Sequence, residues 1–167
     1  SALPELVEKY QVIHQTGTKN FEEVSNLGQI VLKESMNKPN YYAYPYLNKL
    51  AIRMCAGVAN LVISRAGANS IAEIACWGLP SIIVPITNSN GDHQRNNAFN
   101  YARTGACSVV EEANLTPHVL IEEIERILGD EKLAAKMREA TKQFVFPEAE
   151  MHVAKEIINI ALTHENS

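Results

Sequence analysis

The chain has 167 residues, of which 46% are hydrophobic and 20% charged, and this is enough for one soluble domain with a real core. Its formal net charge of -4 at pH 7 gives no reason to expect a nucleic-acid partner. No apolar run approaches the roughly 20 residues that cross a bilayer, and no signal peptide opens the sequence. The cysteines Cys55, Cys76 and Cys107 fit no metal spacing and no disulfide framework, which favours a reducing cytoplasm.

Short apolar stretches alternate with stretches of helical spacing along the whole chain. In chain order, the first half predicts the end of a helix before residue 10, a strand over 12–14, a helix over 20–34, a strand over 41–44, a helix over 47–56 and a strand over 61–63. The second half predicts a helix over 71–77, a strand over 81–86, a helix over 94–103, a strand over 107–110, and helices from 117, over 131–144 and over 148–162.

This alternation predicts an α/β fold with a doubly wound, Rossmann-like parallel sheet. Ligands of such sheets bind beyond the carboxyl ends of the strands, where the strand order switches. A domain of this kind normally begins with a strand, so the opening helix predicts a further strand ahead of residue 1. The loops that follow strands are the candidate site: residues 14–17, 44–47, 64–70 and 87–94.

The segment from Ser64 to Glu73 is the strongest of these signals. Ala66, Gly67 and Ala68 have almost no side chain, so a ligand can approach the backbone, and Gly67 is the expected position for an unusual backbone angle. The helix that follows directs free N–H groups and the positive end of its dipole at this space, which suits a phosphate. The segment predicts a nucleotide or nucleotide-sugar site.

Glu73 has two interpretations that the spacing does not separate. We expect it in the first turn of the helix, where a carboxylate can accept bonds from two adjacent ribose hydroxyls. The spacing Ser70-x-x-Glu73 is also that of a capping box, in which Glu73 only returns to the Ser70 N–H.

The loop of residues 88–97 is dense in amide side chains. Asn-Gly turn chemistry accounts for its first half, but it accounts less well for His93, Gln94 and Asn97. With Asp92 as the N-cap, Gln94 and Asn97 lie three apart on one helix face, where amides can bind sugar hydroxyls.

Single charged or titratable residues carry weaker signals. His14 at a strand end is a candidate acid or base, although such a histidine is more often structural. Lys19 and Arg65 are candidate phosphate contacts, although one loop cation is usually just solvated.

The motifs together resemble the peptidoglycan N-acetylglucosaminyltransferases of glycosyltransferase family 28. The resemblance extends over nearly the whole chain, with the motifs in the family's order. It rests on five segments: Val12 to Gly17, Ser64 to Ala68, Ala72 to Ala75, Gly78 to Pro85, and Asp92 to Gln94 with Asn97, Ala98, Gly105 and Ala106.

The resemblance implies that residues 1–167 are the single carboxy-terminal, donor-binding domain of a two-domain enzyme of the GT-B type. The domain would lack its first strand and a glycine-rich loop, and the amino-terminal acceptor domain would be absent. It implies transfer of N-acetylglucosamine from UDP-N-acetylglucosamine to a lipid-linked muramoyl precursor at the inner face of the bacterial plasma membrane. Membrane association would involve only the absent domain, and no cofactor or metal is implied.

The same resemblance assigns donor contacts. Glu73 would hold the ribose, and the Leu47 backbone would bond the uracil. The other implied contacts face the diphosphate and the sugar: Gly67, Ala68, Asn69, Ser70, His93, Gln94 and Asn97. Two departures from the family lie near Leu47: Asn48 and Lys49 stand where the family usually has acidic residues, and about two extra residues lie between Leu47 and Ala59.

Three other functions stay open on the sequence. The chain fits a non-catalytic nucleotide-sugar-binding subunit that pairs with a separate acceptor-binding protein. It also fits a family 28 transferase with another sugar or lipid acceptor. A dinucleotide-binding oxidoreductase is disfavoured, because no G-x-G-x-x-G follows a strand.

Overall fold

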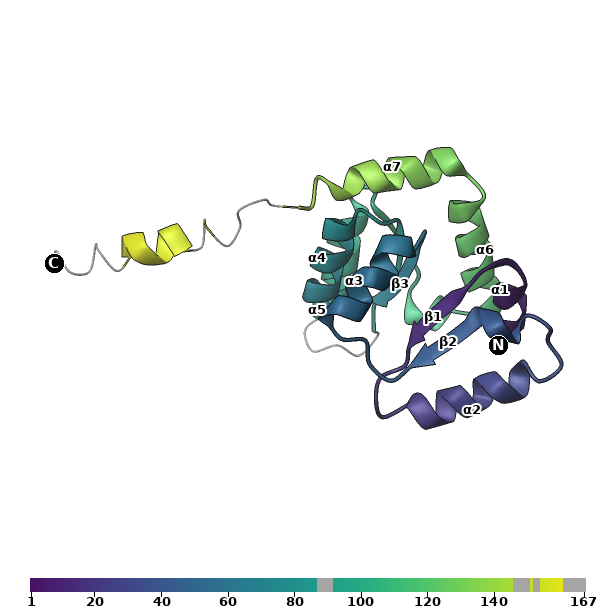
Figure 1. The fold of residues 1–167 in the computed structure, drawn as a ribbon. Coiled ribbons are helices and arrows are strands. Elements are labelled where there is room, and N and C mark those ends of the chain that lie inside the picture. Colours follow the sequence, from purple (N-terminus) through teal and green to yellow (C-terminus); the bar gives the residue numbers. More distant parts are fainter. Residues whose placement is uncertain (87–91, 146–150, 152–153, 161–167) are drawn as a thin grey trace.

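A computed structural model describes residues 1–86, 92–145, 151 and 154–160. Helices and strands alternate in it as the sequence predicts (Figure 1). The elements are α1 (Leu3–Lys9), β1 (Val12–Gln15), α2 (Phe21–Val31), η1 (Lys38–Asn40), β2 (Tyr41–Tyr44), α3 (Lys49–Val58), β3 (Val62–Arg65), α4 (Ala68–Trp77), β4 (Ser81–Val84), α5 (His93–Ala102), β5 (Cys107–Val109), η3 (Glu112–Asn114), α6 (Pro117–Leu128) and α7 (Glu131–Thr141).

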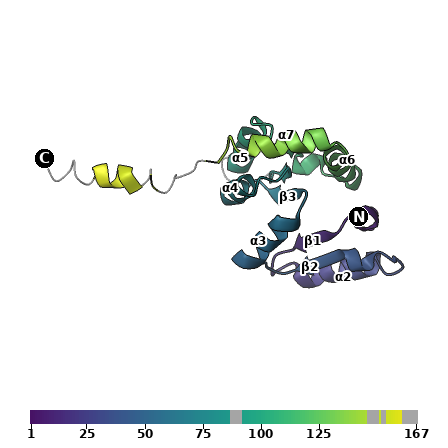
Figure 2. The same ribbon diagram turned by 45° about the horizontal axis from the view of Figure 1, so that its top comes forward.

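All strand pairs are parallel, which confirms the predicted fold class, but the strands form two sheets. β1 pairs with β2 in a two-stranded sheet, and β3, β4 and β5 form a three-stranded sheet with β4 in the centre. Figure 2 shows β1 and β2 set apart from β3. The expected single sheet is therefore interrupted between β1 and β3.

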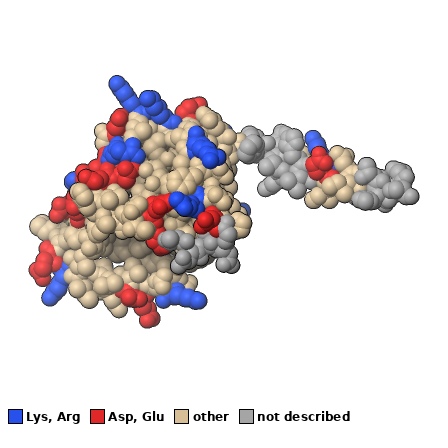
Figure 3. Space-filling view, turned by 180° about the vertical axis from the view of Figure 1, so that it is seen from behind, with Lys and Arg blue, Asp and Glu red and all other residues tan. Residues whose placement is uncertain are grey.

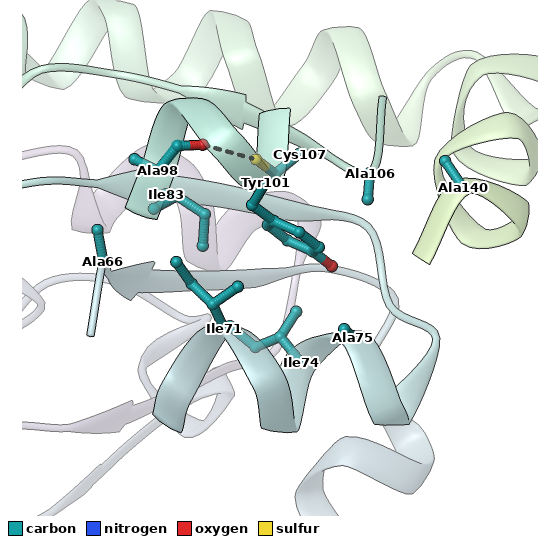
Figure 4. Close-up of a cluster of buried hydrophobic side chains, with 10 residues drawn as sticks. All are labelled: Ala66, Ile71, Ile74, Ala75, Ile83, Ala98, Tyr101, Ala106, Cys107 and Ala140. Atoms are coloured by element: carbon teal, nitrogen blue, oxygen red, sulfur yellow. Dashed lines mark hydrogen bonds between the residues drawn. The ribbon is translucent and has the colours of Figure 1, made fainter. Parts of the chain in front are cut away.

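The core lies on both faces of the three-stranded sheet. Ile83 points into a cluster between the sheet and helices α4 and α5 (Figure 4). The Tyr101 ring in this cluster meets the Phe144 ring edge to face, with 4.9 Å between the ring centroids. Its neighbours Ile82 and Val84 point to the other face, toward α6 and α7. Burial on both faces explains why the β4 sequence is continuously apolar.

Several element boundaries differ from the sequence predictions. α4 begins at Ala68 rather than residue 71, since the small residues of the turn join the helix. α3 begins at Lys49, because the Asn48 side chain accepts a hydrogen bond from the Ala51 N–H and caps the helix there. α7 ends at Thr141 rather than at residue 144. α4 ends at Trp77 as predicted, and Gly78 follows it in the left-handed conformation with φ 69°. The helix predicted over 148–162 is described only at residues 151 and 154–160, which are helical.

Candidate functional site

The carboxyl ends of β3 and β4 lie next to each other, because the two strands pair in register from Val62 with Ser81 to Arg65 with Val84. The turn after β3 leads into α4, and the chain after β4 leads into α5, which packs beside α4. The two segments that the sequence singled out, around residues 64–73 and 92–97, therefore meet at one edge of the sheet.

The amino end of α4 presents backbone N–H donors that the helix itself does not use. The first intrahelical bond runs from the Ile71 N–H to the Gly67 carbonyl at 3.0 Å, so the N–H groups of Ala68, Asn69 and Ser70 have no partner within the helix. Gly67 is the N-cap and supplies no side chain. By contrast, Asn48, Thr116 and Asp130 cap α3, α6 and α7 with their side chains. The α4 terminus suits an anionic ligand.

Two expectations about this turn are wrong. Gly67 has φ -67° and ψ 138°, an ordinary extended backbone that other residues also adopt. Glu73 lies in the second turn of α4, not the first, because the helix starts three residues earlier than expected. Ser70 is inside the helix rather than at its N-cap, so the capping box does not form. The exposed Glu73 carboxylate has no hydrogen bond or ion pair within the part of the chain that the structure describes.

The amide side chains of α5 are fixed by backbone groups of the neighbouring segments. The Ile86 N–H donates to Gln94 Oε1 at 3.2 Å, and Asn97 Nδ2 donates to the Ala66 carbonyl at 3.3 Å. Among the described residues, the Gln94 NH₂ group and the Asn97 side-chain oxygen have no hydrogen-bond partner. His93 is exposed on the first turn of the same helix.

Asp92 occupies the predicted N-cap position of α5 but makes no capping bond. Its φ of 54° is left-handed, and its side chain accepts no hydrogen bond from the first turn. The predicted loop residues 87–91 lie outside the described residues.

Leu47 lies at the carboxyl end of the other sheet, in the turn between β2 and α3. Its N–H already donates to Gln15 Oε1 at 2.8 Å, so a uracil base reaches this N–H only by displacing Gln15. The Leu47 carbonyl has no partner among the described residues. The hydrogen bond from Gln15 was not predicted, since it links residues 32 apart in the chain.

Of the single charged or titratable candidates, Arg65 and His14 have partners within the protein, whereas Lys19 is exposed. Arg65 pairs with Glu112 at 2.7 Å, and Arg95 pairs with Glu111 at 3.0 Å, which links β3 and α5 to the segment after β5. His14 Nδ1 lies 2.9 Å from the Tyr41 hydroxyl, and partial burial lowers the pKa of His14 below its ordinary 6.5. Both findings favour structural roles for Arg65 and His14.

Two other kinds of site find no support in the described ranges. No group of three His, Cys, Asp or Glu side chains there is arranged to hold a metal ion. No helix there is long and apolar enough to cross a membrane.

A surface hollow on α2 and η1, lined by Asn26, Gln29, Ile30, Lys33 and Lys38, contains none of the predicted donor contacts. Basic and acidic side chains are interspersed on the face seen in Figure 3, which gives no basic tract for a nucleic acid.

The chain has named relatives among known proteins. Two relatives bear the name UDP-N-acetylglucosamine--N-acetylmuramyl-(pentapeptide) pyrophosphoryl-undecaprenol N-acetylglucosamine transferase. The one from Halothermothrix orenii is 35% identical over 142 residues, which are 83% of this chain and 37% of the relative. The one from Natranaerobius thermophilus is 35% identical over 156 residues, which are 92% of this chain and 41% of the relative.

The fold has a counterpart among solved structures. The crystal structure of Acinetobacter baumannii MurG superposes with a TM-score of 0.74 at 26% identity, over 94% of this chain and 44% of that one. The chain thus spans less than half the length of these relatives. Residues 1–153 match the glycosyltransferase family 28 C-terminal domain, and the chain belongs to this family.

Proposed function

We propose that residues 1–167 are the donor-binding part of an inverting transferase that moves N-acetylglucosamine from UDP to the lipid-linked muramoyl-pentapeptide precursor of peptidoglycan. The observation that carries the proposal is the edge where the uncapped α4 terminus lies beside the amide side chains of α5. The names of the relatives supply the donor and the acceptor.

The proposal gives each group a task. The N–H groups of Ala68, Asn69 and Ser70 would face the diphosphate, and Glu73 would accept hydrogen bonds from the ribose hydroxyls. The Gln94 NH₂ group and the Asn97 side-chain oxygen, with His93 beside them, would contact the sugar. When the acceptor hydroxyl attacks the anomeric carbon, negative charge grows on the leaving UDP. Fixed N–H donors stabilise this charge without reorganisation.

The rest of the enzyme is also part of the proposal. The acceptor and the base that activates it would be bound by an amino-terminal domain outside residues 1–167. That domain would hold the enzyme at the inner face of the bacterial plasma membrane. The chain by itself is then expected to bind the donor weakly and not to turn over.

Titration of residues 1–167 with UDP-N-acetylglucosamine, UDP-glucose and NAD, followed by amide chemical shifts, tests this function. We expect saturable binding of UDP-N-acetylglucosamine, with the largest shifts at residues 66–73 and 93–97. UDP-glucose should bind more weakly, because it lacks the acetamido group. Saturable preference for NAD, or shifts confined to another face, would contradict the proposal.

Gly67 offers a variant that separates binding from folding. A Cβ at this position would lie 3.6 Å from Ser70 Oγ, an ordinary contact, and the backbone is extended. Gly67→Ala should therefore fold normally but place a methyl group where the diphosphate approaches, and weaken donor binding by about tenfold. The matched control is Gly57→Ala, where a Cβ meets nothing within 4 Å.

A further inference from the structure

The first turn of α5 carries a charge that its own helix disfavours. Among the described residues, the Asp92 side chain at the N-cap accepts no capping bond, and the first turn contains no acidic residue. The third residue of the helix is Arg95, although the positive end of the helix dipole repels a cation at this place. The local sequence therefore does not account for how this turn is held, and contacts with other segments must do so.

Two such contacts lie on different flanks of the turn. On one flank, the Ile86 N–H donates to Gln94 Oε1 at 3.2 Å. On the other flank, Arg95 forms an ion pair with Glu111 at 3.0 Å. Adjacent residues of a helix point roughly 100° apart, so these two contacts restrain the turn from two directions. The Arg95 guanidinium also lies 5.8 Å from the centre of the Phe99 ring, one turn further along α5, which keeps the side chain against its own helix.

Glu111 is attached to the centre of the three-stranded sheet. It directly follows Val110, which is buried and whose N–H donates to the Ile83 carbonyl at 3.1 Å. The Glu111 carbonyl accepts a hydrogen bond from the Asn114 N–H at 2.8 Å and so begins η3. The Glu111 carboxylate is thus carried by backbone that is bonded on both sides, and it gives α5 a fixed partner.

The next residue makes an equivalent contact with the other half of the candidate site. Glu112 forms an ion pair with Arg65 at 2.7 Å. Arg65 is the last residue of β3, and the turn that leads into α4 follows it directly. Two consecutive carboxylates therefore contact the two segments of the site separately, Glu111 the start of α5 and Glu112 the turn before α4.

The value of the Glu111 pair lies in geometry more than in stability. Both partners are half-exposed, and pairs of this kind add little to the free energy of unfolding because water screens them. A ligand contact, by contrast, is sensitive to a displacement of about 1 Å in the groups that make it. His93 and Gln94 directly precede Arg95, so a shift of Arg95 moves both of these proposed sugar contacts.

We propose that Glu111 is a positioning residue for the sugar half of the donor site. It acts through Arg95, holds the first turn of α5 at a fixed distance from the turn before α4, and does not touch the donor itself. The inference rests on the proposed function for the identity of the ligand. It adds to that function a residue pair that sets the preference for the complete sugar nucleotide over the nucleotide alone.

The dissociation constants of residues 1–167 for UDP-N-acetylglucosamine and for UDP test the proposal, since UDP lacks the sugar. Glu111→Gln removes the charge and keeps the size of the side chain. It should raise the constant for UDP-N-acetylglucosamine by about tenfold and change the constant for UDP by less than about twofold. Glu112→Gln should change both constants by the same factor, because Arg65 adjoins the turn that faces the diphosphate.

A matched pair elsewhere controls for the loss of an ion pair as such. Glu123 and Arg126 of α6 form an ion pair at 2.8 Å, and Glu123 also accepts a hydrogen bond from Ser108. Glu123→Gln should therefore cost at least as much stability as Glu111→Gln, yet leave the ratio of the two dissociation constants unchanged.

Exchange of the two charges tests whether Glu111 acts through Arg95. Arg95→Glu alone places two carboxylates together and should lose the preference for UDP-N-acetylglucosamine. The double variant Arg95→Glu/Glu111→Arg restores opposite charges and should recover the parental ratio to within about threefold. A double variant no better than Arg95→Glu would overturn the proposal.

Amide hydrogen exchange gives a readout that needs no ligand. In Glu111→Gln, the amides of Asn96 and Asn97 in the first turns of α5 should exchange several-fold faster, whereas that of Tyr101 later in the helix should not change. Unaltered exchange at Asn96 and Asn97 would overturn the proposal.

The outcomes separate this proposal from the function on which it rests. A parent chain that binds neither ligand would overturn both. A parent chain that prefers UDP-N-acetylglucosamine, with a Glu111→Gln variant that keeps this preference or weakens both ligands equally, would overturn the role of Glu111 alone.

Discussion

The side-chain amide of Asn97 donates a hydrogen bond to the backbone carbonyl of Ala66 at 3.3 Å. This bond ties the second turn of α5 to the turn that precedes α4, so it holds the proposed sugar contacts beside the proposed phosphate donors. The position of Ala66 is secured further by its complete burial in the core between β4, α4 and α5.

The Asn97 bond predicts a linked loss of stability and binding. Asn97→Ala should lower the free energy of unfolding by about 0.5–1.5 kcal/mol and weaken donor binding by about tenfold or more. Asn97→Asp should lower the free energy of unfolding more than Asn97→Ala does, because its carboxylate would face the Ala66 carbonyl without a proton to donate. Urea unfolding and donor titration measure both effects. The exposed neighbour Asn96 is the control, and an Asn96→Ala effect as large as that of Asn97→Ala would remove the reason for the prediction.

The hydrogen bond between the Leu47 N–H and Gln15 Oε1 predicts a role for Gln15 in shaping the base subsite. Gln15→Ala should loosen the turn between β2 and α3, lower stability by about 1 kcal/mol and raise the dissociation constant for uridine nucleotides. Gln15→Glu keeps an acceptor at this position and should bind nearly as the parent does. If Gln15→Ala instead tightens nucleotide binding, Gln15 competes with the base for the Leu47 N–H rather than positioning it.

Two glycines should respond to alanine in opposite directions. Gly78 has φ 69°, and its Cβ would meet only Thr141 Oγ1 at 3.8 Å, so strain alone should cost Gly78→Ala about 1–2 kcal/mol. Gly57 lies inside α3 with open space around its Cβ, and Gly57→Ala should stabilise by about 0.5–1 kcal/mol. Thermal unfolding of both variants gives the comparison. Equal shifts of the same sign would show that the two backbone conformations do not differ as described.

Burial predicts a difference between two cysteines. It raises the pKa of the Cys107 thiol to about 12, whereas Cys76 is exposed. At pH 8, iodoacetamide should therefore alkylate Cys76 in the folded protein and leave Cys107 intact, since the thiolate is the reacting species. All three cysteines should react in denaturant, which controls for the reagent. Rapid native alkylation of Cys107 would show that the core between β5 and α5 opens readily.

Local patterns predicted most of the fold. The parallel α/β class, the alternation and the continuous burial of β4 follow from apolar periodicity, because each element must bury its apolar face. The start of α4 was misplaced, since alanine and asparagine at residues 68 and 69 permit either turn or helix and tertiary packing decides. The split into two sheets was not anticipated, because periodicity does not reveal which strands are neighbours.

The candidate site was predicted in part. The segments around Gly67 and Gln94 are adjacent because β3 and β4 pair, which their position after consecutive strands favours. The contacts of Gln15 with Leu47 and of Arg65 with Glu112 join residues far apart in sequence, so spacing carries no signal for them. The choice between ribose binding and capping for Glu73 depended on where the helix begins, and α4 beginning at Ala68 excludes the capping box.

Glu73 gives the most direct test of the account, because it lies at the centre of the proposed donor site and is not engaged by any described residue. The measurement is the KM for UDP-N-acetylglucosamine of the full-length enzyme with Glu73→Ala, with Glu22→Ala on the distant α2 as the control. Two charge-assisted bonds to ribose predict a rise in KM of about tenfold to a hundredfold for Glu73→Ala and no change for Glu22→Ala. An unchanged KM for Glu73→Ala would contradict the proposed ribose contact and the donor site built around it.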